Sequence, residues 1–142
     1  MIHVDVNKRV VCPWSVATVK KILGCVEQIT KSSGHVEINI VGDTEIKKLN
    51  FRYRGLNKVT DVLSFAWQEE TVVPSKSLGQ IYICYPHIVR QAKKFNVTAN
   101  EEFVRMLAHG FLHIIGHDHN KKKEAKIMFD LQEKIVDKYF SH

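Results

Sequence analysis

Apolar and polar positions alternate with two periods along this chain, and each change of period marks a new expected element. Apolar residues at every second position predict strands, which we place at residues 2–11, 35–41, 59–67 and 78–85. Apolar residues spaced three to four positions apart predict helices that bury one face. These helices are expected at residues 13–32, 43–53, 86–96, 99–115 and 121–139.

The order of these elements predicts a fold of the α+β class, close to α/β, in a single domain. Its sheet would have about four strands covered by helices. A length of 142 residues suits one core, and neither a repeat nor a linker divides the chain. The polar segment 68–77 between two of the strands is expected to be a flap that responds to substrate.

The helix expected from residue 99 has an unusually long apolar surface. Thr98 and Glu101 have the spacing of a capping box, which predicts its start. Most of its circumference is apolar, so we expect it to be buried. The stripe that remains is expected to line a cleft and holds Glu102, Arg105, His109 and His113.

The end of that helix has the spacing of a metal site. His109 and His113 are four residues apart, so both rings lie on one side of a helix. Gly116 follows where a helix often ends in a left-handed residue, and the turn can bring His119 beside the first two rings. Three imidazoles leave the fourth position of a tetrahedral zinc open, as catalytic zinc sites require. The sequence therefore predicts one catalytic zinc ion per chain.

The same histidine spacing occurs in metzincin proteases, which place a glutamate directly after the first histidine as general base. This chain has Gly110 there, so a different reaction is expected. A metal-dependent hydrolase of another class, such as a peptidase, is the alternative. A non-enzymatic protein with a structural zinc is a third possibility.

The charge of the chain favours a polyanionic partner. The net charge is +6, and one cationic segment contains no acid between residues 47 and 58. Phe51 and Tyr53 lie within this segment, and aromatic rings can stack on unpaired bases while cations neutralise phosphates. The alternative for this segment is a solvated helix face with two core aromatics. A second cationic run, Lys121 to Lys123, could bind the same partner or could be only the exposed first turn of the last helix. The candidate RNA contacts are Lys47, Lys48, Arg52 and Lys58.

Two blocks of the sequence resemble the YbeY family of rRNA-maturation endoribonucleases. Residues 109–119 read HGFLHIIGHDH and match the family pattern H-G-x-L-H-x-x-G-x-D-H at every fixed position. Residues 53–55 and 60–65 read YRG and TDVLSF, similar to the family's Y-R-G and T-[DN]-V-L-S-F-P. Two positions differ from the family pattern: Ala66 replaces a proline, and Gln80 replaces an aspartate near the site.

The resemblance implies a metal-dependent nuclease that cleaves single-stranded RNA, including the 3′ end of small-subunit rRNA, with the ribosome as partner. By matching positions, His109, His113 and His119 would bind zinc, and Arg54 would be the catalytic or RNA-binding arginine. Zinc can polarise a phosphoryl oxygen and lower the pKa of bound water from about 15.7 to about 7. Gly110 would leave space for the substrate backbone.

The remaining polar residues near the motif have weaker expected roles. His117 could accept a proton, and Asp118 could orient a ligand imidazole or form part of the turn. Asp61 and Ser64 could support Arg54, although ordinary hydrogen bonds at a strand end would explain them equally well. Three separated cysteines and the lack of an apolar run of about 18 residues lead us to expect a cytoplasmic protein that does not bind membranes.

Overall fold

The computed structural model describes residues 1–66, 77–117 and 120–141, and this part of the chain forms four strands and five helices. The strands are β1 (Ile2–Lys8), β2 (Gly34–Val41), β3 (Val62–Ala66) and β4 (Ser77–Cys84). The helices are α1 (Val16–Thr30), α2 (Asp43–Arg54), α3 (Tyr85–Lys94), α4 (Ala99–Ile114) and α5 (Lys122–Phe140). None of these helices is long and apolar enough to cross a membrane.

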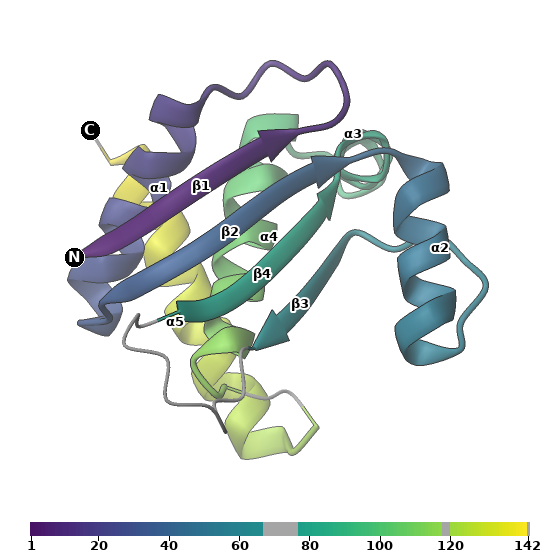
Figure 1. Ribbon diagram of the computed structural model, residues 1–142. Coiled ribbons are helices and arrows are strands. Elements are labelled where there is room, and N and C mark those ends of the chain that lie inside the picture. Colours follow the sequence, from purple (N-terminus) through teal and green to yellow (C-terminus); the bar gives the residue numbers. More distant parts are fainter. Residues whose placement is uncertain (67–76, 118–119, 142) are drawn as a thin grey trace.

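The strands form one mixed sheet in the order β1-β2-β4-β3 (Figure 1). β1, β2 and β4 are parallel to one another, and β3 pairs with β4 in the antiparallel direction. Most side chains that face the helices are apolar, as Val36, Ile38 and Ile40 are on β2, and Ser64 on β3 is a polar exception. The expected α+β single domain with four strands is therefore confirmed.

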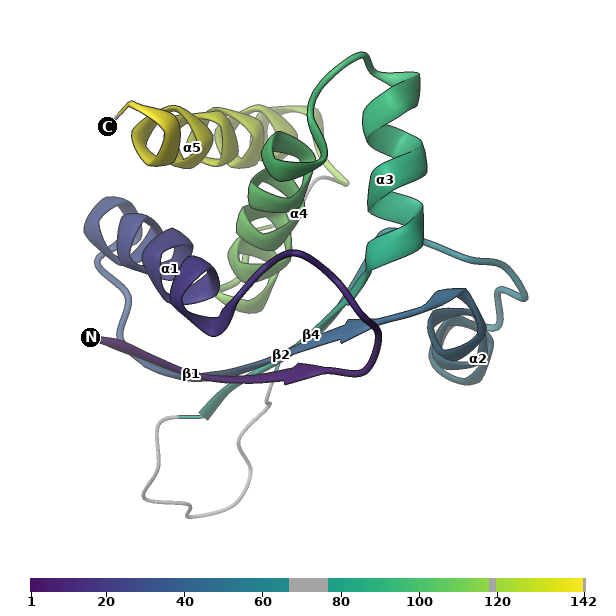
Figure 2. The same ribbon diagram turned by 90° about the horizontal axis from the view of Figure 1, so that it is seen from above.

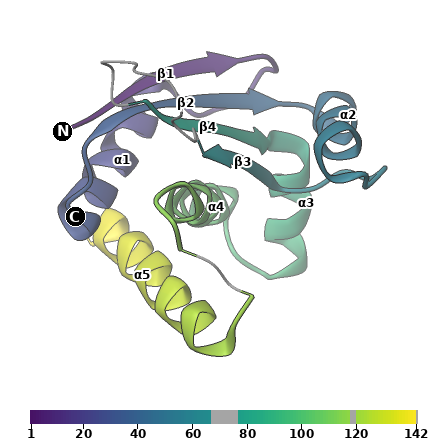
Figure 3. The same cartoon turned by 60° about the horizontal axis from the view of Figure 1, so that its bottom comes forward.

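The helices are divided unequally between the two faces of the sheet. α1, α3, α4 and α5 lie on one side, whereas α2 lies at the end of the sheet (Figure 2). α4 runs beneath β3 and β4 with α5 packed on its far side (Figure 3). Since ten of the sixteen residues of α4 are buried, the expectation that most of its circumference is covered is confirmed.

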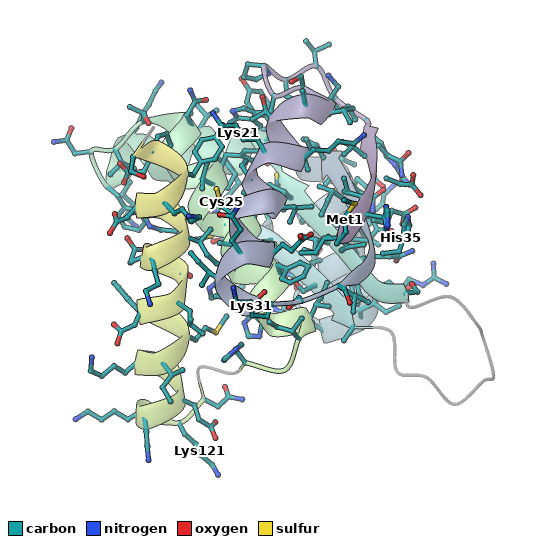
Figure 4. All side chains as sticks on the ribbon, turned by 90° about the vertical axis from the view of Figure 1, so that its left-hand side faces the viewer. Met1, Lys21, Cys25, Lys31, His35 and Lys121 are labelled. Atoms are coloured by element: carbon teal, nitrogen blue, oxygen red, sulfur yellow. The ribbon has the colours of Figure 1, made fainter. Side chains whose placement is uncertain are left out.

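Contacts from both ends of the chain hold α4 in place. Trp14, just before α1, stacks on Phe103 of α4 with ring centroids 3.9 Å apart, and its indole N–H donates to Asn100 Oδ1. α1 and α5 lie side by side, with Lys21 over the ring of Tyr139 at 5.3 Å (Figure 4). The helix that carries His109 and His113 is therefore a rigid, central element.

Three expected boundaries were wrong. α1 begins at Val16 rather than near Pro13, because the Ser15 hydroxyl accepts a hydrogen bond from the Thr18 N–H and so caps the helix. β3 begins at Val62 rather than Val59, whereas the segment 2–11 forms a single strand, β1, within the expected one or two. Tyr85 belongs to α3 and not to β4. The expected flap at 68–77 lies outside the described residues, except for Ser77, which begins β4.

Gly110 faces the sheet, which corrects the expectation that it leaves room for substrate. A Cβ atom here would lie 2.9 Å from Ser64 Oγ and 3.1 Å from Val62 Cγ2 and Ile81 Cγ2. The Ser64 hydroxyl also donates a 3.0 Å hydrogen bond to the Gly110 carbonyl. The glycine therefore allows α4 to approach β3 and β4 closely.

Alanine at Gly110 should destabilise the protein relative to alanine at Gly24, a glycine inside α1 where an added Cβ would have nothing within 4 Å. Both changes gain the same helix propensity, about 1 kcal/mol, so their difference isolates the clash at Gly110. We expect the free energies of unfolding of the two variants to differ by about 1–3 kcal/mol, the usual cost of overpacking. Equal stabilities in urea denaturation would show that α4 does not pack tightly at Gly110.

Candidate functional site

A cavity of about 360 Å³ lies between α4, the end of α2 and the segment that leads into β3. It brings together residues that are more than fifty positions apart in the sequence. Arg54 comes from the last turn of α2, and His109 and His113 come from the second half of α4. The full lining comprises Arg54, Thr60, Asp61, Val62, Ser64, Ala66, His109, His113 and Ile114.

The two histidine rings lie close together, as their spacing predicts. Their centroids are 4.8 Å apart and their planes are inclined by 76°. The Nδ1 atom of His109 is 2.8 Å from the carboxamide oxygen Oε1 of Gln132, on α5. An Nδ1–H that donates to this oxygen leaves Nε2 of His109 as the nitrogen that could bind the predicted metal.

Gln132 is itself held by charged neighbours. Its Nε2 donates to Glu133 Oε2 at 3.1 Å, and Arg105 binds both oxygens of Glu133 through Nε and Nη2 at 2.8 and 2.9 Å. The hydrogen bonds from Arg105 hold the pKa of the Glu133 carboxyl below its usual range, and Glu133 raises the pKa of Arg105. A fixed ion pair therefore orients the amide that contacts His109.

Glu102 and Arg105 do not share the histidine cavity, contrary to expectation. Glu102 is 2% exposed, its carboxylate is 3.2 Å from Arg105 Nη1, and it also accepts a hydrogen bond from Gln91. Both residues line a neighbouring hollow beside Gln132 and Glu133. Helical spacing places the four residues on one stripe of α4, but Arg105 and Glu102 are engaged by Glu133 and Gln91 in a hollow separate from the histidine cavity.

The turn after α4 has the predicted geometry. Gly116 has φ = 103°, a conformation in which a residue with a side chain would be strained. The N–H of Gly116 donates to the His113 carbonyl and the N–H of His117 donates to the Leu112 carbonyl, which together form a Schellman motif. The chain therefore turns directly after α4, at the glycine that the sequence predicted would turn it.

The third expected metal ligand, His119, and its neighbour Asp118 lie outside the described residues. Within the described ranges, no group of three His, Cys, Asp or Glu side chains could hold a metal ion. His117 is described, and it is not among the described residues that line the cavity. The assignments of His119, Asp118 and His117 stay predictions.

Arg54 is the cation of the cavity. It is solvent-exposed, and no ion pair joins its guanidinium to any residue in the part of the chain that the structure describes. The other cationic side chains of the segment are also exposed but do not line the cavity. They are Lys47, Lys48, Arg52 and Lys58. Phe51 and Tyr53, which the alternative interpretation placed in the core, are exposed too, by 58% and 57%.

Asp61 and Ser64 have structural partners. Asp61 Oδ1 accepts a 2.7 Å hydrogen bond from the Val62 N–H, and its Oδ2 accepts one from Gln91. Ser64 donates to Gly110, as described above. These bonds are those of a strand end and a helix–sheet contact, so they explain both residues without a role in supporting Arg54.

Gln132 was not identified from the sequence, although a signal was available. It occupies a position on the apolar stripe of α5, between Met128 and Val136, and is only 9% exposed. A polar residue at a buried position needs a hydrogen-bonding partner. The sequence does not reveal that this partner is His109, because the pairing depends on how α5 packs on α4.

If His109 is a zinc ligand, as the sequence predicts, replacing Gln132 by leucine should lower the affinity for zinc by about 10- to 100-fold, the usual cost of losing a partner that orients a ligand imidazole. Gln28→Leu on α1 is a control that should leave zinc affinity unchanged. Competition with a chromogenic chelator measures both affinities. Equal affinities in Gln132→Leu and the wild-type chain would exclude the role of Gln132.

Comparisons with known proteins identify the family. A sequence model of the family described as Endoribonuclease YbeY matches residues 7–140. The Endoribonuclease YbeY of Sulfurihydrogenibium sp. (strain YO3AOP1) is 39% identical over 112 residues, covering 78% of this chain and 74% of the relative. That of Malacoplasma penetrans (strain HF-2) is 32% identical over 132 residues, covering 92% and 88%. The solution structure of TM1509 from Thermotoga maritima superposes with a TM-score of 0.67 and 32% identity, covering 99% of this chain and 90% of that one.

Proposed function

The chain belongs to the Endoribonuclease YbeY family, and from this we propose that it is a zinc-dependent endoribonuclease that cleaves single-stranded RNA. Its proposed substrate is ribosomal RNA, including the 3′ end of the small-subunit rRNA, processed in the cytoplasm with the small ribosomal subunit as partner. Processing at this step also serves ribosome quality control.

The observation that carries this proposal is the cavity that joins Arg54 to His109 and His113. A cation that pairs with none of the described residues faces two imidazoles across a space of about 360 Å³. This combination suits a phosphodiester, since a guanidinium binds phosphate oxygens in pairs and imidazoles bind a metal ion.

The described residues supply two of the donors that the proposed zinc site needs. His109 and His113 supply imidazole donors, and the bond from His109 Nδ1 to Gln132 is the kind of contact that orients a zinc ligand. We assign the third ligand to His119. A zinc ion held by these residues would supply Lewis acidity toward a phosphoryl oxygen and would lower the pKa of water.

Arg54 has a separate role in the proposed reaction. Its guanidinium would bind two non-bridging oxygens of the phosphate and neutralise the charge that develops on them in the transition state. Its position in the last turn of α2, directly before Gly55 with φ = 70°, fixes where the side chain leaves the helix. The helix end therefore fixes the backbone position from which the guanidinium reaches the cavity.

A peptidase is disfavoured by the packing of Gly110. A metzincin-like glutamate at this position would extend from a Cβ that is already 2.9 Å from Ser64 Oγ and 3.1 Å from Ile81 Cγ2. It would enter the sheet rather than the cavity. Asp61, the carboxylate among the described lining residues, is engaged by the Val62 N–H and Gln91.

We further propose that the cationic segment on and after α2 binds the RNA backbone. Neutralising Lys47, Lys48, Arg52 and Lys58 should then flatten the salt dependence of binding. For each lost phosphate contact, the slope of log affinity against log salt should fall in magnitude by roughly 0.7. Fluorescence anisotropy with a single-stranded oligoribonucleotide measures it. Neutralising Lys121 to Lys123 is the control. A slope that changes only in this control would indicate that the RNA backbone binds at α5 and not at the segment on and after α2.

The experiment that tests the proposed activity compares three substrates: single-stranded RNA, double-stranded RNA and casein. We expect the zinc-loaded chain to cleave the single-stranded RNA and to leave the other two intact. Casein digestion without RNA cleavage would favour the peptidase. Stoichiometric zinc with no cleavage of any substrate would favour a structural metal.

A further inference from the structure

A second, smaller cavity lies next to the first one on the outer face of the sheet. Its volume is about 210 Å³, which is well above the roughly 30 Å³ share of one water molecule and below the roughly 300 Å³ of small drug-sized pockets. That size suits one flat ring system. The lining comprises Leu49, Tyr53, Phe65, Ala66, Gln80 and Tyr82.

Three aromatic side chains line this cavity. Phe65 packs edge-to-face with Tyr53 at a centroid distance of 5.0 Å and with Tyr82 at 5.9 Å. Such edge-to-face contacts leave ring faces available for stacking. Tyr53 is 57% exposed at the rim, where it gains little from burial within the chain itself.

Gln80 adds a polar group that can form hydrogen bonds with the edge of a nucleobase. It lies opposite Phe65 in the β3–β4 pairing, and both side chains lie along the same cavity. No hydrogen bond links its carboxamide to any other residue in the ranges that the structure describes. A carboxamide offers one acceptor and two donors, which matches the adjacent donors and acceptors on nucleobases.

The two cavities share a wall. Ala66 lines both of them, and Tyr53 of the second cavity directly precedes Arg54 of the first. Arg52 lies over the Tyr53 ring with its guanidinium carbon 5.5 Å from the centroid, so the rim of the second cavity is cationic. A phosphate bound at Arg54 would therefore have an aromatic, positively bordered pocket beside it.

We propose that this second cavity binds one unstacked base of single-stranded RNA, adjacent to the phosphate held at Arg54. The base stacks against Tyr53 and its edge pairs with the carboxamide of Gln80. This inference rests on the proposed endoribonuclease function and adds a base-binding subsite to it. Such a subsite requires an unpaired nucleotide, so it would also explain a preference for single strands.

The test compares Tyr53→Ala with Phe95→Ala, because Phe95, at the end of α3, is as exposed as Tyr53 but does not line either cavity. With single-stranded RNA, we expect kcat/KM for cleavage to fall by about 5- to 150-fold in Tyr53→Ala, the range for loss of one base–aromatic stack, and to stay within about twofold in Phe95→Ala. On RNA that lacks the base beside the cleaved phosphodiester, wild type and Tyr53→Ala should become equal.

A second variant tests the edge contact. Gln80→Leu keeps the stacking wall and should reduce the preference of the enzyme among the four bases at that position. Equal losses in Tyr53→Ala and Phe95→Ala on intact RNA, with wild-type cleavage still present, would overturn the base-binding subsite and leave the proposed activity standing. A wild-type chain that cleaves no RNA would overturn both.

Discussion

His113→Ala should lose zinc and RNA cleavage together. His113 and His109 both line the cavity, with their ring centroids 4.8 Å apart, and no described histidine besides these two lines it. Removing a direct ligand should lower zinc affinity by more than the roughly 100-fold that loss of an orienting partner costs. Metal content of the purified variant and initial rates on single-stranded RNA measure the two effects.

The matched control is His3→Ala, which removes an exposed histidine from β1. It should keep one zinc per chain and wild-type cleavage. The circular dichroism spectrum of His113→Ala should stay helical, because alanine is favourable in the last turn of α4. A purified His113→Ala chain with stoichiometric zinc of unchanged affinity would remove His113 from the metal site.

Arg54→Ala should keep zinc and fold while kcat falls by about 10²- to 10³-fold, the usual effect of removing one transition-state donor. The side chain is exposed and pairs with no described acid, so its loss should cost little stability. Arg54→Lys should rescue poorly, since an ammonium is a point charge and does not form the bidentate contact. Steady-state kinetics on single-stranded RNA measure all three proteins.

Arg52→Ala on the same helix separates chemistry from binding. Arg52 does not line the cavity, so its loss should raise KM and reduce the salt dependence with little change in kcat. If Arg54→Ala showed this same pattern, Arg54 would be an RNA-binding residue and not a catalytic one.

Much of the fold follows from local patterns in the sequence. Thr98 accepts a hydrogen bond from the Glu101 N–H and α4 begins at Ala99, as the capping pattern predicts. Gly116 adopts the left-handed turn that its place after His113 indicates. These features depend on neighbours within a few residues, and for that reason the sequence is sufficient to predict them.

The features that were missed depend on packing between distant elements. Gly110 was interpreted by comparison with proteases. Its role is in fact determined by residues 62–64 of β3 and residue 81 of β4, which pack against it. Gln132 contacts His109 because α5 packs on α4. The second cavity, next to Arg54, forms because α2 reaches β3 and β4. Periodicity places a residue on a face of its own element and does not indicate what covers that face.

Removal and return of the metal test the central claim most directly. The purified chain is stripped with a chelator, dialysed, and titrated with zinc while cleavage of a single-stranded RNA is followed. The proposed function predicts that cleavage disappears on stripping and returns in proportion to zinc up to one equivalent per chain. Full cleavage by a chain with no measurable metal, or uptake of one zinc with no return of cleavage, would contradict it.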